Sequence, residues 1–305
     1  MITKHDNEQS NMKILLIYPY FLDKRIHAYE ISVPPIGIYY VGAQLKENGY
    51  NVHVCNWHDA NHTPNIIPET IKKERPDIIG FSILHANRWG GIDIAKIAKN
   101  LNPDIKIVFG GIGATFLWDH LLTHFRDIDY IVLGEGEIPF LQLVKALDTG
   151  AHDKIPLIPG IAFRHQGRPQ KTDPAEPVED LDQFPNPARY FQFQHVAFTR
   201  GCPGNCAFCG SPRFWGPRVR SHSPGYFVDQ LELLTQKGIH FFYFSDDTFT
   251  YKKQWVQTIC QEIVHRRLHI TWVAIARVNH IQADLLGWMR KAGCIQISFG
   301  IESGS

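Results

Sequence analysis

The second half of the chain is organised around the stretch Thr199-Arg-Gly-Cys-Pro-Gly-Asn-Cys-Ala-Phe-Cys-Gly210, which spaces three cysteines as C-x3-C-x2-C. Three thiolates this close together, from Cys202, Cys206 and Cys209, hold three corners of a cubane iron–sulfur cluster. The fourth iron of such a cluster then lacks a protein ligand. An iron with an open position binds and reduces a small molecule, whereas a fully ligated cluster mainly passes electrons. The spacing therefore predicts a [4Fe-4S] cluster that takes part in chemistry.

The main alternative to a cluster is a zinc site. Zinc usually takes four ligands in two pairs, but the remaining cysteines stand singly, and we expect them to be small buried hydrophobes; they are Cys55, Cys260 and Cys294. His222 is the residue that would complete a zinc tetrad, so a zinc-binding regulatory protein stays open as an alternative. Disulfides are not expected, because the first residues do not resemble a secretory signal and the protein reads as cytoplasmic.

The cysteine triplet, with Phe208 before its third cysteine, resembles the signature of the radical S-adenosylmethionine (SAM) superfamily. The resemblance implies that the open iron chelates the amino and carboxylate groups of SAM. It also implies that one electron from the cluster cleaves the sulfonium to a 5′-deoxyadenosyl radical. The protein is therefore expected to be an enzyme that needs an electron donor such as flavodoxin or ferredoxin.

The composition is that of an ordinary globular protein with room for two domains. The chain has 305 residues, of which 44% are hydrophobic and 20% are charged, and this length suffices for two cores. Its formal net charge of +1 argues against a nucleic-acid surface, which would be strongly basic. The longest apolar runs fall far short of the ~20 residues that span a bilayer. Residues 1–12 are polar and are expected to form a disordered leader.

Residues 13–150 alternate between short apolar runs and helical segments, which predicts an α/β domain with a doubly wound, Rossmann-like parallel sheet. Among the expected elements are a strand at 106–110 and a helix at 119–125. In such sheets ligands lie beyond the carboxyl ends of the strands. Two glycine-rich turns fall there and are candidate ligand contacts, although tight turns explain glycines equally well; their residues are Gly110, Gly111, Gly113, Gly134, Glu135 and Gly136.

Three segments of this half, taken in order, resemble the cobalamin-binding domain that often precedes a radical SAM domain. They are Val33-Pro-Pro-Ile-Gly-Ile38, Gly110-Gly-Ile-Gly-Ala-Thr115 and Leu133-Gly-Glu-Gly-Glu137. The resemblance covers residues 13–150 and implies that the glycine turns face the corrin and its nucleotide tail. Cobalamin is therefore an expected cofactor.

One motif departs from the cobalamin pattern. Many cobalamin proteins supply an axial histidine from Asp-x-His-x-x-Gly, but this chain has Asp23-Lys-Arg-Ile-His27. The spacing is different and the glycine is absent, so His27 is expected to be a loop residue rather than a cobalt ligand. His58 and His62 are expected in a solvated loop. If cobalamin binds, we expect it to lack a histidine ligand from the protein.

The second half predicts a different α/β arrangement after a connector. Residues 151–194 are rich in proline and are expected to form an ordered linker. From residue 195 the alternation of strand and helix restarts, and a strand at 196–199 leads directly into the cysteines. The resemblance implies that residues 195–305 form part of a partial (βα) TIM barrel, with the cluster at the carboxyl end of its first strand.

Three further segments are candidate SAM contacts in the family picture. Ser245-Asp-Asp-Thr248 takes the place of the turn that binds the SAM amino group; Asp246 or Asp247 would pair with the ammonium, unless both acids cap the next helix. Gly300-Ile-Glu-Ser-Gly304 resembles another contact segment, in which Glu302 would bond a ribose hydroxyl and Ser303 the carboxylate. Arg277 would pair with the SAM carboxylate, or else be a surface charge.

The chain ends with four barrel strands where the family normally uses six. We therefore expect a truncated barrel or one that needs a partner polypeptide to supply the missing strands, because a cut parallel sheet leaves an apolar edge.

The leading functional hypothesis is a cobalamin-dependent radical SAM methyltransferase that acts on a small molecule, at an unactivated carbon or phosphorus. A second reaction of the same family is oxidative ring formation, as in anaerobic porphyrin cyclisation. A non-catalytic corrinoid or cluster-binding module is an alternative of another class. A nucleic-acid substrate is disfavoured by the neutral charge.

Overall fold

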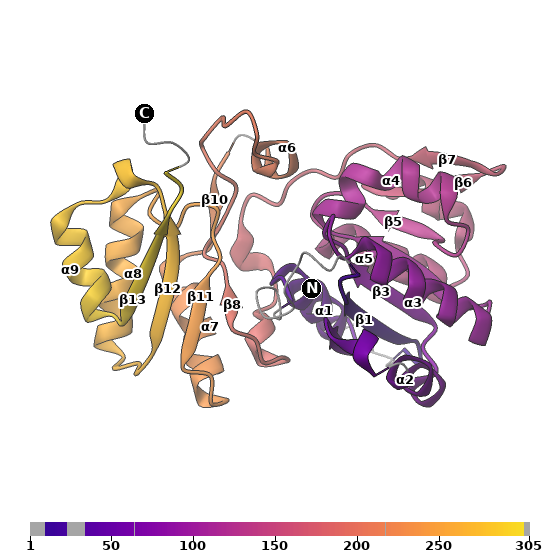
Figure 1. Ribbon diagram of the computed structural model, residues 1–305, viewed down its shortest axis with the longest axis horizontal. Helices are drawn as coiled ribbons and strands as arrows, with labels where there is room; N and C mark the ends of the chain where they lie inside the picture. Colours follow the sequence, from indigo (N-terminus) through magenta and orange to yellow (C-terminus); the bar gives the residue numbers. More distant parts are fainter. Residues whose placement is uncertain (1–9, 23–33, 64, 217, 302–305) are drawn as a thin grey trace, which may run out of the picture. The chain divides into compact units, whose positions relative to one another are not determined.

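The computed structural model describes residues 10–22, 34–63, 65–216 and 218–301 of the chain. These residues divide into two compact units, Met1–Glu176 and Pro177–Ser305, each with its own sheet (Figure 1). No helix in the described ranges is long and apolar enough to cross a membrane.

The first unit is built on a seven-stranded sheet with the order β2-β1-β3-β4-β5-β6-β7. Strands β1 to β5 are parallel to one another. Strand β6 pairs antiparallel with β5, and β7 pairs antiparallel with β6. The order reverses beside β1, which is where ligands bind in doubly wound sheets. The strands are β1 (Lys13–Pro19), β2 (Asn51–Trp57), β3 (Ile78–Ser82), β4 (Lys106–Gly110), β5 (Tyr130–Val132), β6 (Ile161–His165) and β7 (Arg168–Lys171).

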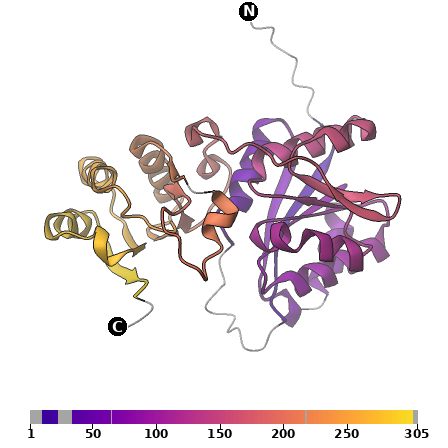
Figure 2. The ribbon, with the colours of Figure 1, turned by 90° about the horizontal axis from the view of Figure 1, so that it is seen from above.

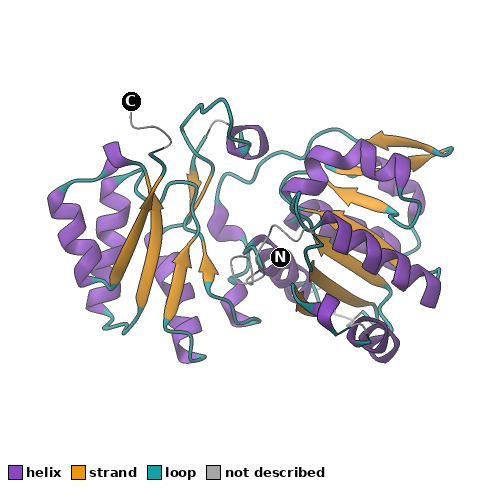
Figure 3. Ribbon diagram, viewed as in Figure 1, coloured by secondary structure: helices purple, strands orange, loops and turns teal. Residues whose placement is uncertain are grey.

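Among the described residues of this unit, helices α1 to α5 cover the two faces of the sheet (Figure 3). Helix α1 packs against α5, and α2 packs against α3. Their bounds are α1 Gly37–Glu47, α2 Ile66–Glu74, α3 Arg88–Leu101, α4 Ile112–His124 and α5 Glu137–Asp148. The predicted doubly wound α/β architecture is thus confirmed.

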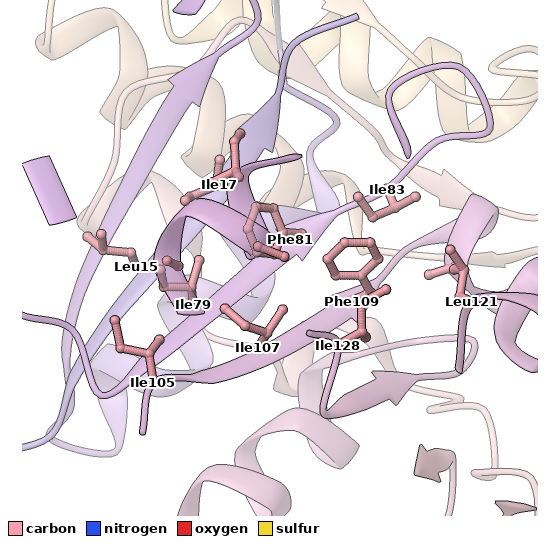
Figure 4. Close-up of a cluster of buried hydrophobic side chains, with 14 of the residues drawn as sticks. Leu15, Ile17, Ile79, Phe81, Ile83, Ile105, Ile107, Phe109, Leu121 and Ile128 are labelled. Carbon is pink, nitrogen blue, oxygen red and sulfur yellow. The ribbon is translucent and has the colours of Figure 1, made fainter. Parts of the chain in front are cut away.

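The core of the first unit follows from the strand register. Leu15, Ile79 and Ile107 are paired across β1, β3 and β4 and face the same side of the sheet. Ile17, Phe81 and Phe109 form the next layer along the same strands, and all six side chains are buried (Figure 4). Central parallel strands are covered on both faces, which is why they read as continuous apolar runs.

The predicted linker, residues 151–194, is divided by the structure. Its first part supplies β6 and β7, which extend the first sheet as a hairpin. Gln166 and Gly167 form the two-residue turn and both have positive φ, 51° and 77°, as hairpin turns of this length require. The remainder, from Pro177 onward, belongs to the second unit.

The second unit contains a four-stranded parallel sheet with the order β13-β12-β11-β8. Within the described part of this unit, helices α7, α8 and α9 cover one face of the sheet (Figure 2). The strands are β8 (His195–Val196), β11 (Phe241–Phe244), β12 (Thr271–Ala276) and β13 (Cys294–Phe299), and the helices are α7 (Pro224–Gln236), α8 (Lys253–His265) and α9 (Ala283–Lys291). Aromatic rings fill the layer between sheet and helices, where Phe244 stacks on Trp272 at 4.3 Å.

Two predicted elements differ from the structure. The strand expected at 196–199 is split, because Thr199–Arg200 leaves the barrel sheet as β9 to pair with β10 (Arg220–Ser221). The helix expected at 119–125 begins earlier, at Ile112. Gly113 was expected in a glycine-rich turn, but the helix starts directly after Gly111 and includes Gly113.

Candidate active site

The cysteine loop, residues Gly201–Gly210, connects β9 to the short helix α6 (Ser211–Trp215). Cys202 is half-buried, Cys206 and Cys209 are exposed, and all three thiols are free. The Cys209 amide donates a hydrogen bond to the Cys206 carbonyl at 3.1 Å, and the Gly204 amide donates to Cys202 Sγ at 3.4 Å. The loop therefore holds three accessible sulfur donors on one short, internally bonded segment.

Gly201 is required at the start of the cysteine loop. Its φ is +97°, and a Cβ there would lie 2.6 Å from the Arg218 carbonyl oxygen. Both the backbone angle and the space exclude a side chain.

Arg277, which follows β12, reaches the cysteine loop. A Cβ added to Gly204 would collide with Arg277 Nη1 and would lie 3.4 Å from Cys202 Sγ. The guanidinium therefore lies against the loop rather than on a remote surface. A cation in this place suits a carboxylate ligand.

Asp246 follows β11 and is buried, with 1% of its surface exposed. Its Oδ1 accepts hydrogen bonds from the Thr199 amide and the Thr199 hydroxyl, both at 2.6 Å, and its Oδ2 accepts from the Phe198 amide at 3.3 Å. Burial raises the pKa of Asp246 to about 6, and these hydrogen bonds act in the opposite direction. The side chain was predicted as a partner for the SAM amino group, but both of its oxygens are directed at the protein backbone.

Asp247 is exposed, unlike its neighbour. Its Oδ2 accepts a hydrogen bond from Ser211 Oγ at 2.6 Å, so it lies at the far end of the cysteine loop. Neither acid caps the next helix, since α8 has Lys252 at its N-cap without a side-chain bond. Of the two predicted ammonium partners, Asp247 is the one that an external ligand can reach.

The donor set fits an iron–sulfur cluster better than zinc. His222, the proposed fourth zinc ligand, is buried elsewhere; its Nδ1 lies 3.0 Å from Asp182 Oδ1 and its ring stacks on Tyr226 at 4.2 Å. Within the described ranges, no three His, Cys, Asp or Glu side chains gather around a point that one metal ion could occupy. A cubane cluster binds each thiolate through a different iron, so its ligands need not converge on one ion.

A polar pair on the sheet beside this site was missed from the sequence. His195 Nδ1 and Ser245 Oγ share a hydrogen bond of 2.8 Å, and the imidazole stacks on Tyr243 at 4.6 Å. Burial lowers the pKa of His195. The imidazole is thus held in a fixed orientation with its neutral form favoured.

In the first unit, both glycine turns follow neighbouring strands, β4 and β5. Gly111 and Gly134 have φ of +89° and +70°, and nothing lies within 4 Å of a Cβ built on Gly134. Thr115 joins the turns, since its hydroxyl donates to the Gly111 carbonyl at 2.9 Å and accepts from the Gly134 amide at 3.0 Å. The open space at Gly134 fits the close approach of a ligand such as a corrinoid.

The other residues of these turns have different surroundings. Gly113 is needed for packing, because a Cβ there would lie 2.5 Å from the Leu84 carbonyl carbon. A Cβ on Gly136 would approach Val41 Cγ2 at 3.3 Å, whereas one on Gly110 would make only ordinary contacts. Glu135 is half-buried in the second turn.

Several predicted residues lie outside the described ranges or away from the sites. Glu302, Ser303 and His27 are not among the described residues. His58 lies 3.3 Å from Asn56 Oδ1 through its Nδ1, and His62 is exposed in a short 3₁₀ turn.

Sequence reasoning missed Thr199, Ser211 and Thr115, which orient these segments. The available signal was position alone: Thr199 lies three residues before the first cysteine, Ser211 lies two after the last, and Thr115 lies four after Gly111.

Comparison with protein families gives two matches. The B12 binding domain matches residues 25–144, and the radical SAM superfamily matches residues 196–305.

Individual relatives match almost the whole chain. It is 33% identical over 306 residues to an uncharacterized methyltransferase of Pyrococcus horikoshii, covering 96% of this chain and 66% of the relative. It is 32% identical over 317 residues to an anaerobic magnesium-protoporphyrin IX monomethyl ester cyclase of Rubrivivax gelatinosus, covering 96% of this chain and 56% of the relative.

The solved structure of the cobalamin-dependent S-adenosylmethionine radical enzyme OxsB, with aqua-cobalamin and S-adenosylmethionine bound, has the same fold. Its TM-score is 0.80 at 20% identity, covering 98% of this chain and 45% of that one. The chain thus spans 45–66% of the length of these three proteins.

Proposed function

Because the chain belongs to the radical SAM superfamily and carries a B12 binding domain before its radical SAM domain, we propose that it is the cofactor-binding part of a cobalamin-dependent radical SAM methyltransferase with a small-molecule substrate. The observation that carries the proposal is the cysteine loop, which holds three accessible thiols beside the Arg277 guanidinium. The relative from Pyrococcus horikoshii, which is named a methyltransferase, supports the choice of reaction.

The protein's part in this reaction is to hold and orient the cofactors. Cys202, Cys206 and Cys209 would bind three irons of a [4Fe-4S] cluster. When bound, the cluster supplies the electron that cleaves the SAM sulfonium, and the corrinoid supplies a transferable methyl group. An electron donor such as flavodoxin or ferredoxin would reduce the cluster.

Four residues are proposed to hold SAM. The Asp247 carboxylate suits the SAM ammonium, and the Arg277 guanidinium suits the SAM carboxylate. Glu302 would bond a ribose hydroxyl and Ser303 the carboxylate. These contacts fix the sulfonium relative to the cysteine loop.

The glycine turns are proposed to receive the corrinoid. Gly110, Gly111 and Gly113 in the first turn, and Gly134, Glu135 and Gly136 in the second, lie at the carboxyl ends of β4 and β5. Nothing lies within 4 Å of a Cβ built on Gly134, so there is open space beside this residue.

The first experiment reconstitutes the chain anaerobically with iron and sulfide, incubates it with hydroxocobalamin, and records the visible spectrum after desalting. We expect corrinoid bands over broad iron–sulfur absorbance. Cys206→Ala should lose the cluster absorbance and SAM cleavage but keep the corrinoid bands. A wild-type chain that keeps zinc and shows no iron–sulfur absorbance would refute the cluster.

Oxidative cyclisation is the second candidate, because the magnesium-protoporphyrin relative is 32% identical over 96% of this chain. The two reactions differ in the fate of the SAM methyl group. With methyl-labelled SAM and reduced corrinoid, a methyltransferase moves label onto the corrinoid, whereas a cyclase leaves it in methionine. Label found only in methionine would favour the cyclase.

A further inference from the structure

The two acids that follow β11 accept hydrogen bonds from residues at different ends of the cysteine loop. Asp246 binds Thr199, three residues before the first cysteine, through the amide and the hydroxyl. Asp247 binds Ser211, two residues after the last cysteine, at 2.6 Å. Adjacent residues at one strand end therefore contact both ends of the loop.

The contact at the first end is strong. Three donors converge on the Asp246 carboxylate, two of them backbone amides, and the group is buried. Hydrogen bonds to a charged group are shorter and stronger than neutral ones, and burial leaves no water to replace a lost partner. Asparagine cannot reproduce this arrangement, because its NH₂ would face a backbone N–H donor.

At the second end of the cysteine loop, the exposed Asp247 accepts one hydrogen bond, from the hydroxyl of Ser211. Ser211 is buried and donates to Asp247, whose other oxygen accepts no hydrogen bond from any described residue. Asparagine in place of Asp247 would still accept from Ser211 through its carbonyl oxygen, but it would carry no charge. The two carboxylates can therefore be distinguished by the same substitution.

We propose that Asp246 and Asp247 form a carboxylate clamp, which holds Thr199 and Ser211 against the end of β11 and so fixes the two ends of the cysteine loop before any cofactor binds. Asp246 is a positioning residue that touches no ligand. Asp247 closes the second end and keeps its charge for a ligand. The link to cluster binding rests on the proposed function, but the clamp itself does not.

The first test uses the apo chain, so that it does not depend on a cluster. Amide hydrogen exchange is followed by mass spectrometry in peptides covering residues 196–201 and 210–215. Asp246→Asn should speed exchange in the first peptide, and Ser211→Ala should speed it only in the second. Asp247→Asn should leave both near wild type. Unchanged exchange in Asp246→Asn would overturn the clamp.

The second test measures loss of iron to a chelator after anaerobic reconstitution. Asp246→Asn should lose iron about tenfold faster than wild type, as expected when one charge-assisted hydrogen bond is lost. Asp247→Asn should keep iron at the wild-type rate but bind SAM more weakly. Equal iron loss in both variants would mean that charge, rather than the clamp, retains the cluster.

Two further variants keep the test decisive. Thr199→Val removes only the hydroxyl donor at 2.6 Å and keeps the shape of the side chain, so it should give an intermediate rate even if Asp246→Asn misfolds. Asp284→Asn, which breaks an exposed pair with Lys253, is the matched control and should change neither readout. If wild type shows the exchange pattern but takes up no iron, the proposed function fails while the clamp stands.

Discussion

At the scale of single residues, charge and burial separate groups that look alike in the sequence. Asp246 and Asp247 are neighbours, yet one carboxylate is enclosed by backbone donors and the other is exposed. Arg277 lies against the cysteine loop, while Arg290 in α9 is exposed on the surface of the same unit. The chemistry of each group follows from what surrounds it.

Arg277→Met should weaken SAM binding by about tenfold or more, because a paired guanidinium and carboxylate contribute on the order of 1.5–3 kcal/mol. Equilibrium dialysis of labelled SAM against the reconstituted chain measures the change. Arg290→Met is the control and should bind SAM like wild type. Wild-type affinity in Arg277→Met would remove this residue from the SAM site.

His195 should make unfolding depend on pH near neutrality. Burial lowers the pKa of the folded imidazole, so the unfolded chain takes up a proton at a higher pH, near ~6.5. The free energy of unfolding should therefore fall as pH drops through ~6.5 toward the folded pKa. The difference between wild type and His195→Gln in urea titrations isolates this effect; a constant difference from pH 7.5 to 5.5 would contradict it.

At the scale of elements, strands and helices are joined by single polar side chains. Arg164 on β6 donates from Nε, Nη1 and Nη2 to the carbonyls of Leu122, Ile128 and Phe125, at 2.8, 2.7 and 2.5 Å. The first of these carbonyls belongs to the last turn of α4, whose N-terminus carries the first glycine turn. The hairpin strand thus fixes the far end of the helix that begins at the candidate corrinoid site.

Arg164→Met should lower the free energy of unfolding of the first unit by about 2 kcal/mol, because it leaves three carbonyls without their charged donor. Urea unfolding followed by hydrogen exchange in residues 112–128 measures the loss. Arg168→Met on the neighbouring strand, where the side chain is exposed, should change it by less than ~0.5 kcal/mol. If Arg164→Met and Arg168→Met lower the free energy of unfolding equally, α4 does not depend on the hydrogen bonds from Arg164.

At the scale of the whole chain, two units carry separate cores. Ile79 is fully buried in the first sheet, and Trp272 is fully buried in the second, where its Nε1 donates to the Ala292 carbonyl at 2.8 Å. Each unit should therefore unfold as its own cooperative block.

Ile79→Ala should destabilise only the first unit and Trp272→Ala only the second, each by about 3–4 kcal/mol. Hydrogen exchange at increasing urea, read separately in peptides of each unit, distinguishes the two losses. A substitution that lowers the stability of both units equally would show that they unfold together.

The sequence predicted the long elements and failed where tertiary contacts decide. The central strand β4 has a buried apolar middle because both faces of the sheet are covered, and its predicted position at residues 106–110 was confirmed. β7 was missed, since Arg168-Pro-Gln-Lys171 has none of the usual residues of a strand. The break between β8 and β9 depends on pairing with β10, some twenty residues later, which local patterns do not contain.

The site was predicted in the same uneven way. The spacing of the three cysteines predicts a cluster site, and the structure shows that all three lie on one loop with free thiols. Asp246 or Asp247 was expected to pair with the SAM ammonium, because their segment takes the place of the turn that binds the amino group in the family. The structure adds three hydrogen bonds to the Asp246 carboxylate from residues 47 and 48 positions away, which no local pattern predicts.

The hairpin β6–β7 at the edge of the first sheet also affects whether a second copy of the chain can pair with that edge. A bare parallel edge after β5 would offer its backbone groups to a second chain. β6 covers that edge, and β7, which then lies outermost, combines two cations with a proline that has no N–H to donate. A strand of a second copy that paired with β7 would face the positive charges of Arg168 and Lys171 and would lack a backbone N–H donor at Pro169. Pairing of two copies through this side of the sheet is therefore discouraged by the four residues whose sequence least resembles a strand.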